Sequence, residues 1–428
     1  MAITRSQLEA ATEALQLVLK FERPADAVLH DFFRARHALG SRDRAFVAEA
    51  VYGVLRRKRT VDTLAPGGSP RRMLLAWLAR LGGLSVRELA VATSEEEQAW
   101  LSRVKAQPLE NLPLALRAEL PDWIVDRLRS RLPEEEIAGL ARALNEPAPL
   151  DLRVNTLVAE REAVRQGLAI DAVAAEPTPY SPVGLRVRGR PSITRHPLFL
   201  AGAIEVQDEG SQLLGYLLAP RRHDLVVDFC AGSGGKSLLL GALMHSHGRI
   251  YAFDTSAARL ARLKPRLKRS GLSNLYPQPI RNENDIRVKR LAGKIDRVLV
   301  DAPCTGLGTL RRNPDLKWRQ SPQSLEELSR KQAAILRAAA NLVKPGGRLV
   351  YATCSLLEEE NENVVAAFLA ERDDFGMLNC QELLAQQGIV LETGEQLRLL
   401  PHLHDTDGFF AAAMQRKPGT KPALPGPR

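Results

Sequence analysis

Along the first part of the chain, apolar residues recur every three or four positions. Three stretches show this pattern clearly: Leu8–Leu19, Phe46–Leu55 and Leu74–Leu81. Such spacing places the apolar side chains on one face of a helix. Pro121 and Pro133, each followed by acidic residues, begin two further helices, because proline fits a first turn and acids favour a helix N-terminus. The pattern predicts an all-helical domain over residues 1–142.

From His223 onward, short apolar runs alternate with helical segments. Four runs are typical of buried strands: Leu225–Phe229, Arg249–Asp254, Arg297–Asp301 and Arg348–Thr353. A helix is expected after each of them, most clearly over Ser256–Ser270. This alternation predicts an α/β domain over residues 221–416, with a doubly wound, mostly parallel sheet. Residues 397–415 suggest a closing antiparallel hairpin.

The region between these two parts mixes short strands with turns. Leu152–Asn155 and Gly184–Gly189 are candidate strands, and Asn145–Pro149 is typical of a linker. We therefore expect a small α+β domain over residues 143–220. The last residues, 417–428, are rich in proline, glycine and basic side chains, which predicts a disordered tail.

The net charge of +10 is placed unevenly. Residues 221–428 hold 31 Lys and Arg against 22 Asp and Glu, whereas residues 1–146 hold 22 against 20. A basic surface of this kind fits a polyanionic partner, although a solvated basic face would give the same composition. The cluster Arg56–Arg59 likewise has two explanations, which are contact with RNA and complementation of a helix dipole.

Composition argues against several classes of protein. No run approaches the ~18 apolar residues of a membrane span, and the first residues lack the apolar core of a signal peptide. The four cysteines form no CxxC pair, so neither a disulfide framework nor a zinc site is expected, and free thiols fit a reducing cytoplasm. The pairs His245/His247 and His402/His404 lack metal-ligand spacing, so we expect no metal.

A glycine-rich turn follows the first predicted strand of the α/β domain. Its sequence, CAGSGGK over Cys230–Lys236, lacks the first glycine of a phosphate-binding P-loop and the third glycine of a dinucleotide fingerprint. A methyltransferase loop needs only a small-residue turn after the first strand and an acid that ends the second. Asp254 ends that strand, 22 residues beyond Gly232, which is the right distance for a carboxylate on ribose hydroxyls. A tight turn without a ligand remains the alternative.

Two cysteines lie where predicted strands end. Cys304 follows Arg297–Asp301, and Cys354 follows Arg348–Thr353. Carboxyl ends of parallel strands meet at one edge of a sheet, so both thiols should lie beside the glycine-rich loop. If that loop holds S-adenosylmethionine, the thiols suit methylation of cytosine C5. This poor nucleophile is activated when a thiolate adds at C6, and the adduct then needs a base at C5 and a group at N3. Cys230 and Cys380 are expected to be small buried side chains.

The residues around both cysteines resemble a known family. Asp301–Cys304 (DAPC), with Gly306, Arg311-Arg312, Pro314-Asp315 and Lys317-Trp318, is similar to motif IV of the RsmB/Nop/NSUN family of RNA cytosine-5 methyltransferases, and Thr353–Ser355, with Glu360-Asn361, is similar to its motif VI. Gly202–Gln212 resembles the stretch that leads into the family's catalytic domain, and Leu39–Arg57 resembles its NusB-like helical domain. The resemblance covers nearly the whole chain. It implies a Rossmann-like class I methyltransferase fold, S-adenosyl-L-methionine as cofactor and 16S rRNA as partner.

The resemblance also implies roles for individual residues. Cys354 would be the nucleophile, Cys304 would assist proton removal and product release, and Asp301 would contact both the cytosine and the cofactor region. The ribose would be held by Asp254, and the methionine end of the cofactor by Cys230, Ala231, Gly232, Ser233, Gly234, Gly235 and Lys236.

The position of the adenine-binding acid is less determined, and one loop departs from the family. Asp285 is the candidate beside the adenine, with Asn282 and Asn284 as alternatives. The family's loop commonly has Ala and Pro where this chain has Gly232 and Ser233, so we expect a more flexible turn that still binds the cofactor.

Three functions remain open at this point. The first is methylation of cytosine C5 in RNA, either 16S rRNA or another RNA such as tRNA. The second is a non-catalytic RNA-binding or assembly factor on a methyltransferase scaffold, and the intact cysteine and aspartate positions argue against it. The third is a DNA cytosine methyltransferase, in which the thiol after Pro303 attacks, and the Thr353-Cys354-Ser355 motif argues against that.

Overall fold

The computed structural model describes residues 3–109, 112–189 and 191–419. Contacts divide the chain into two compact units, one formed by residues 1–147 and 309–322 and the other by residues 148–308 and 323–428. The predicted boundaries after residues 142 and 220 stay predictions, because this division keeps the small β-sheet region with the α/β region. The predicted tail over residues 417–428 lies, beyond Gly419, outside the described residues.

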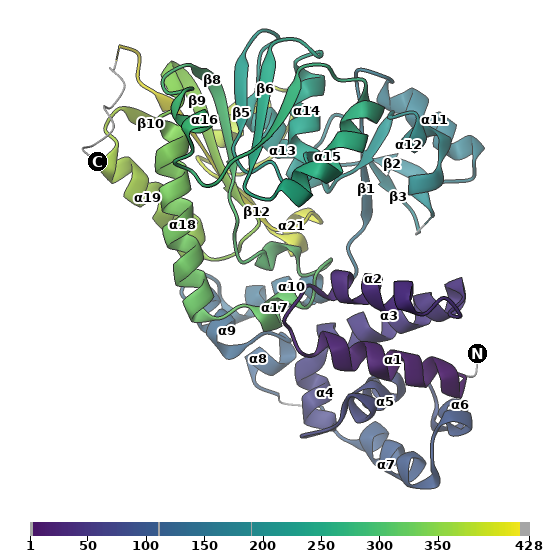
Figure 1. Cartoon of the computed structure of the whole chain (residues 1–428). Helices are drawn as coiled ribbons and strands as arrows, with labels where there is room; N and C mark the ends of the chain where they lie inside the picture. Colours follow the sequence, from purple (N-terminus) through teal and green to yellow (C-terminus); the bar gives the residue numbers. More distant parts are fainter. Residues whose placement is uncertain (1–2, 110–111, 190, 420–428) are drawn as a thin grey trace. The chain divides into compact units, whose positions relative to one another are not determined.

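The first unit is helical, as the spacing of apolar residues predicted (Figure 1). Its helices are α1 (Arg5–Val18), α2 (Ala25–Ala35), α3 (Ser41–Arg56), α4 (Lys58–Leu64), α5 (Pro70–Arg80), α6 (Val86–Leu89), α7 (Glu95–Ala106), α8 (Leu114–Arg117), α9 (Asp122–Arg129), α10 (Glu134–Asn145) and α17 (Leu316–Arg319). The predicted apolar positions form the core, except for Leu81, which is exposed. In this core α1 packs on α3 and α5, and α5 packs on α7. Helices α9 and α10 begin directly after Pro121 and Pro133, as expected.

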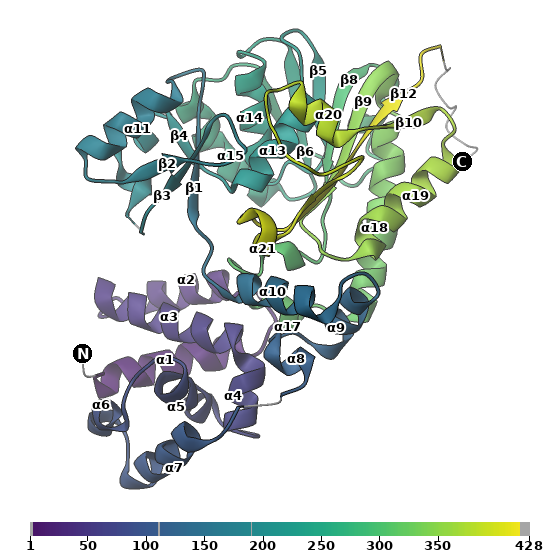
Figure 2. The same ribbon diagram turned by 180° about the vertical axis from the view of Figure 1, so that it is seen from behind.

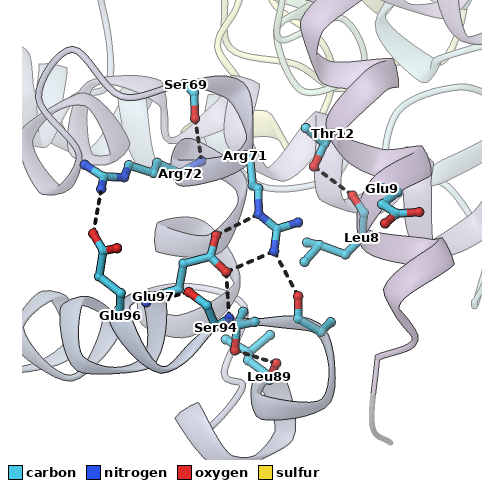
Figure 3. A network of polar contacts seen from close by, with 12 residues as sticks. Leu8, Glu9, Thr12, Ser69, Arg71, Arg72, Leu89, Ser94, Glu96 and Glu97 are labelled. Carbon is cyan, nitrogen blue, oxygen red and sulfur yellow. Dashed lines mark hydrogen bonds and ion pairs between the residues drawn. The ribbon is translucent and has the colours of Figure 1, made fainter.

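A polar network connects α5 with the start of α7 (Figure 3). The Arg71 guanidinium donates two hydrogen bonds to the Glu97 carboxylate, at 2.7 and 3.0 Å, and a third to the carbonyl of Ala92. Glu97 also accepts a hydrogen bond from the backbone N–H of Ser94, whose hydroxyl accepts one from the Glu97 N–H. This capping box satisfies N–H groups that the first turn of α7 leaves free. Arg71 lowers the pKa of Glu97, so the pair stays ionised.

Residues 309–322 belong to the helical unit although they follow Cys304 in the sequence. The Trp318 indole donates to the carbonyl of Leu55 at 2.8 Å. Lys317 is buried and donates to the carbonyl of Arg56 at 3.0 Å and to Asn145 Oδ1 at 2.9 Å. This end of motif IV therefore serves as a structural anchor in the helical unit.

The basic cluster at the end of α3 makes internal contacts that neither sequence explanation included. Arg56 donates to the carbonyl of Arg311 at 3.2 Å. Arg59 donates to the carbonyl of Leu120 and to Asp122, both at 2.8 Å. These two arginines therefore hold segments of the helical unit together.

The second unit contains a small antiparallel sheet and a large sheet. The small sheet has the order β2-β3-β1-β4, with β1 (Leu150–Val154), β2 (Ala175–Pro177), β3 (Gly184–Val187) and β4 (Ile204–Val206). Helices α11 (Arg161–Ile170) and α12 (Pro197–Leu200), with short 3₁₀ turns, lie in the same region. The candidate strands at Leu152–Asn155 and Gly184–Gly189 are thus confirmed, with slightly different ends.

The large sheet has the order β10-β12-β9-β8-β5-β6-β7, and β11 pairs with β12. Its parallel strands are β5 (Leu225–Asp228), β6 (Arg249–Asp254), β7 (Leu275–Pro279), β8 (Ile295–Asp301) and β9 (Val343–Thr353). Strands β10 (Phe375–Leu378), β11 (Leu397–Leu399) and β12 (Phe409–Arg416) are antiparallel, and β11 with β12 forms the predicted closing hairpin. The predicted α/β class and mostly parallel sheet are confirmed.

Helices cover both faces of the large sheet (Figures 1 and 2). Alternate strand residues such as Val226 and Val227 belong to different clusters of buried side chains. The first cluster includes α13 (Glu209–Leu218), α14 (Gly235–Leu243), α15 (Ala257–Ser270) and α20 (Cys380–Ala385), and the second includes α16 (Ile286–Lys289), α18 (Pro322–Ala340) and α19 (Glu362–Glu371). Because both faces are buried, the strands are continuous apolar runs, which is why the sequence revealed them.

Candidate active site

A cavity of about 670 Å³ lies where the parallel strands end. Strand β5 is its centre, with β6 on one side and β8 on the other. Neighbouring strands therefore lead away in both directions, which is the place where open α/β sheets bind ligands. The predicted site residues that line the cavity are Cys230, Ala231, Gly232, Ser233, Gly235, Lys236, Asp254, Asp301, Cys304 and Cys354.

The glycine-rich loop approaches the core so closely that Gly234 has no room for a side chain. Its φ is +80°, and a Cβ atom there would lie 2.2 Å from Leu263 Cδ1. Gly234 therefore supports the turn without lining the cavity. Arg266 donates to the carbonyl of Ser233 at 2.8 Å, so a contact from α15 holds the turn at the position where the family commonly has proline.

Asp254 holds the start of this loop. One carboxylate oxygen accepts the Gly232 N–H at 2.8 Å, and the other accepts the Ser256 N–H at 2.7 Å. The carboxylate is almost fully buried at the end of β6 and lines the cavity. Since it is held by backbone donors, this carboxylate has a fixed position in the cavity wall.

The structure does not bring Asp285 to the cavity. Its carboxylate accepts hydrogen bonds from the backbone N–H groups of Arg281 at 3.0 Å and Arg287 at 2.9 Å, and it thereby caps α16. These hydrogen bonds lower the pKa of Asp285. Of the two alternatives, Asn282 lines the cavity, as does Glu283, which the sequence analysis did not consider. The candidates lie within a run of polar residues, and nothing in that part of the sequence indicated which of them would reach the cavity.

Asp228 is a cavity residue that sequence analysis missed. It ends β5, is 1 % exposed, and accepts a hydrogen bond from the Ser237 hydroxyl at 2.6 Å. Its Oδ1 atom has no hydrogen-bond partner among the described residues. Burial, together with the nearby carboxylates Asp301 and Asp254, raises the pKa of Asp228 to about 7. The acid at the end of a strand was a visible signal, as it was for Asp254.

We expect Asp228→Asn to raise the melting temperature of the ligand-free protein at pH 8. The pKa of Asp228 is about 7 when folded and near 3.8 when unfolded, so the folded state binds more protons between these values. Stability therefore falls as pH rises from about 4 to 7 and stays low above pH 7. Asparagine removes this effect, so the difference in melting temperature should be several degrees at pH 8 and small at pH 4.

Thermal unfolding of both proteins across this pH range measures the effect. A difference that does not depend on pH would contradict the assignment. Ser237→Ala is the control, because it removes the hydrogen bond to Asp228 but leaves the carboxyl group.

The two motif cysteines face each other. Cys304 Sγ and Cys354 Sγ are 3.4 Å apart, and both side chains are partly exposed and line the cavity. The hydrogen bond to Cys354 and burial raise the pKa of Cys304 well above its ordinary value. These effects favour the thiol form of Cys304, and either sulfur can donate in the contact between them. Cys380 is buried in the core, as expected, whereas Cys230, which was also expected to be buried, is partly exposed and lines the cavity. Desolvation raises the pKa of Cys230 far above its ordinary value.

A partly buried ion pair lies beside the cysteines. Lys236 Nζ is 2.6 Å from Asp301 Oδ2. Burial alone would lower the pKa of Lys236, but Asp301 outweighs it, so the lysine stays charged. Lys236 also interacts electrostatically with Cys354. A cation near a sulfur favours its thiolate form.

Other cavity residues were missed as well: Gln207, Ser211, Arg259, Arg266 and Lys331. The sequence singled out Gly202–Gln212 as a whole, but it assigned no roles within that segment. Arg259, Arg266 and Lys331 lie on helices α15 and α18, whose charged positions look like ordinary solvent-facing residues in sequence.

Comparisons with known proteins agree with this geometry. The family model of the 16S rRNA methyltransferase RsmB/F matches residues 215–415, and a ferredoxin-like domain model of the same proteins matches residues 120–194. The ribosomal RNA small subunit methyltransferase B of Shewanella oneidensis is 32% identical, over 89% of this chain and 92% of its own. A Synechocystis protein named "Probable ribosomal RNA small subunit methyltransferase B" is 34% identical, over 89% of this chain and 93% of its own. The chain belongs to the RsmB/F methyltransferase family.

Solved structures place the fold in the same family. The crystal structure of PH0851 matches with a TM-score of 0.80 and 26% identity, covering 97% of this chain and all of the other. A methyltransferase homologue from Pyrococcus horikoshii matches with a TM-score of 0.61 and 30% identity, covering 72% of this chain and all of the other. The predicted Rossmann-like methyltransferase fold is thereby confirmed.

No helix in the described part of the chain is long and apolar enough to cross a membrane. Nor do the residues of that part contain a group of three or more His, Cys, Asp and Glu side chains that could hold a metal ion.

Proposed function

We propose that this protein methylates C5 of a cytosine in 16S rRNA through a transient bond between Cys354 and C6. Membership of the family already makes it an rRNA methyltransferase that uses S-adenosyl-L-methionine. The observation that carries the finer proposal is the pair of sulfurs 3.4 Å apart in the wall of the cavity.

The cavity residues fit the cofactor. The cavity volume of about 670 Å³ is in the range of small-molecule sites. Asp254 would hold the ribose hydroxyls, and the loop Cys230–Lys236 would surround the methionine end. The Asp228 oxygen that lacks a partner would face that end, where the ligand carries an amino group. When bound, S-adenosyl-L-methionine supplies a methyl group on a sulfonium.

The electrostatics support Cys354 as the nucleophile. Lys236 provides a positive charge that interacts with Cys354, and a cation favours a nucleophilic sulfur. The contact with Cys354 and burial instead raise the pKa of Cys304. A DNA-type mechanism, with attack by Cys304, would need this thiol, whose pKa is raised, to react first.

Methyl transfer would proceed through formation and breakdown of a covalent adduct. The sulfur of Cys354 bonds to C6, which gives C5 the electron pair that takes the methyl group. The C5 proton must then leave, and the electrons of the C5–H bond expel the Cys354 thiolate and restore the ring. Cys304 would first lose its own proton to solvent, would then take the C5 proton as a thiolate, and would finally pass that proton to solvent. Asp301 lies at the same edge of the sheet and would contact the base.

Exposed basic side chains support an RNA partner. On α15, Arg259, Arg262, Lys264 and Lys268 are exposed, and the helix contains no acidic residue. Such a face neutralises phosphates without reading sequence.

Transfer of a labelled methyl group tests the proposal. Purified protein with methyl-labelled S-adenosyl-L-methionine should label 16S rRNA, and bisulfite sequencing should locate the product at one cytosine. Label at a different atom or base, or no label in 16S rRNA, would contradict the proposal. Labelling of a cytosine in tRNA instead would support the proposed reaction but contradict 16S rRNA as the substrate.

A further inference from the structure

Glu360 connects the two cysteine loops. It is fully buried, and its carboxylate accepts the backbone N–H of Thr305 at 2.8 Å together with the hydroxyl groups of Thr305 and Ser355. These are the residues that directly follow Cys304 and Cys354. We propose that Glu360 is a positioning residue whose buried carboxylate fixes the loop of Cys304 against the loop of Cys354, so that both sulfurs face one reacting base. This inference rests on the proposed function.

The Cys304 side is held from both directions. Gln332 on α18 donates to the carbonyl of Pro303 and to Glu360 Oε1, both at 2.9 Å. Residues 303 and 305 are thereby connected to the same carboxylate. The backbone carbonyl of Glu360 in turn accepts the Tyr351 hydroxyl at 2.6 Å, which fixes the carboxylate to β9.

The Cys354 side is held by the neighbour of Glu360. Asn361 accepts a hydrogen bond from the Thr353 hydroxyl and donates to the carbonyl of Ser355 at 3.2 Å. The Gly308 N–H donates to the carbonyl of Cys354 at 2.8 Å, so the two loops also meet directly. Gly308 allows this because a Cβ there would lie 2.2 Å from the carbonyl oxygen of Gly408. Such a connected buried network defines one arrangement.

Charge gives the same residue a second effect. The side-chain partners of Glu360 in the described part of the chain are neutral donors, so no cation cancels its charge there. That charge helps to raise the pKa of Cys304, after the larger effects of Cys354 and burial. Glu360 therefore favours the thiol form of Cys304 as well as its position.

Two substitutions separate geometry from charge. In Glu360→Gln, the amide oxygen can accept from Thr305 and Gln332, while the amide nitrogen donates to the two hydroxyl oxygens, so the network persists without charge. Glu360→Ala removes both. Glu119→Gln is the matched control, because Glu119 is a buried carboxylate that also accepts a threonine N–H and hydroxyl, at Thr60, but lies in the helical unit.

The first measurement needs neither RNA nor cofactor. Phenylarsine oxide condenses with two neighbouring thiols and releases water, so its affinity reports the distance between Cys304 and Cys354. We expect Glu360→Ala to weaken binding at least ~10-fold, and Glu360→Gln and Glu119→Gln to bind like the wild type. The pH at which Cys304 reacts with iodoacetamide, followed by mass spectrometry, should fall in Glu360→Gln and stay unchanged in Glu119→Gln.

The second measurement is the methyl-transfer rate. Glu360→Ala should lower kcat ~100-fold with KM for RNA changed only a few-fold, whereas Glu360→Gln should retain about a tenth or more of the rate. The inference would be overturned if Glu119→Gln lowered kcat as much as Glu360→Ala does, or if Glu360→Ala bound the arsenical as tightly as the wild type. If Glu360→Ala does not fold, Ser355→Ala, which removes one of these contacts, must weaken arsenical binding in its place. If arsenical binding follows the expected pattern in all variants but the wild type methylates no RNA, the proposed function is rejected and the inference about Glu360 stands.

Discussion

Replacing Cys354 with alanine should abolish methyl transfer. No other thiol is placed to replace it, because burial and the charge of Glu360 still raise the pKa of Cys304 when Cys354 is absent, desolvation raises the pKa of Cys230, and Cys380 lies in the core. We expect the rate to fall by roughly a thousandfold or more, as for removal of other covalent nucleophiles. Incorporation of a labelled methyl group into 16S rRNA under single-turnover conditions measures this loss.

Cys380→Ala is the matched control for loss of a thiol. Its side chain is buried against β12, outside the cavity lining, so methyl transfer should remain near the wild-type rate. Retained turnover in Cys354→Ala would remove it as the nucleophile. If Cys304→Ala alone lost all activity and formed no bond to RNA, the attack would have to be assigned to Cys304.

Replacing Cys304 with alanine should trap the enzyme on its RNA. Cys354 could still attack C6 and the methyl group could still be transferred, but loss of the C5 proton would be slow, so the sulfur–carbon bond would persist. We expect a protein–RNA adduct that survives denaturation and a turnover rate that falls ~100-fold or more. A denaturing gel with labelled RNA detects the adduct as a band of reduced mobility.

The double variant provides the control. Cys304→Ala with Cys354→Ala should form no adduct, because the sulfur that would make the bond is gone. An adduct in the double variant, or none in Cys304→Ala while methyl transfer continues, would refute the proposed division of roles. Because the two sulfurs are 3.4 Å apart, both would face the same bound base, so the adduct yields of the two single variants can be compared directly.

The catalytic fold was largely predictable because its signals are local. The runs Arg249–Asp254 and Arg297–Asp301 end where β6 and β8 end, and Ser256 caps α15 one residue before the observed start. Strands β7 and β10, at the two edges of the sheet, were not predicted. Two prolines interrupt the apolar run of β7, and a glycine interrupts that of β10, so neither segment has the pattern of a buried strand.

The candidate site was predictable where it lies at strand ends and unpredictable where helices and loops contribute. Cys304, Cys354 and Asp254 follow strands whose carboxyl ends meet, so the sequence placed them in one cavity. Asp285 and Asn282 are three residues apart in a loop, and only the backbone path decides which of them reaches the cavity. Sequence spacing alone could not make that choice.

The sequence by itself was enough to predict a helical region and an α/β region, the strands that Cys304 and Cys354 follow, and the side chains proposed to react. Periodicity, capping and strand ends are set by residues close together in the chain. Only the tertiary structure decided that Lys317 and Trp318 anchor in the helical unit, and that Glu360 joins the loops of Cys304 and Cys354. Those contacts join residues tens to hundreds of positions apart, and burial gives each of them its strength.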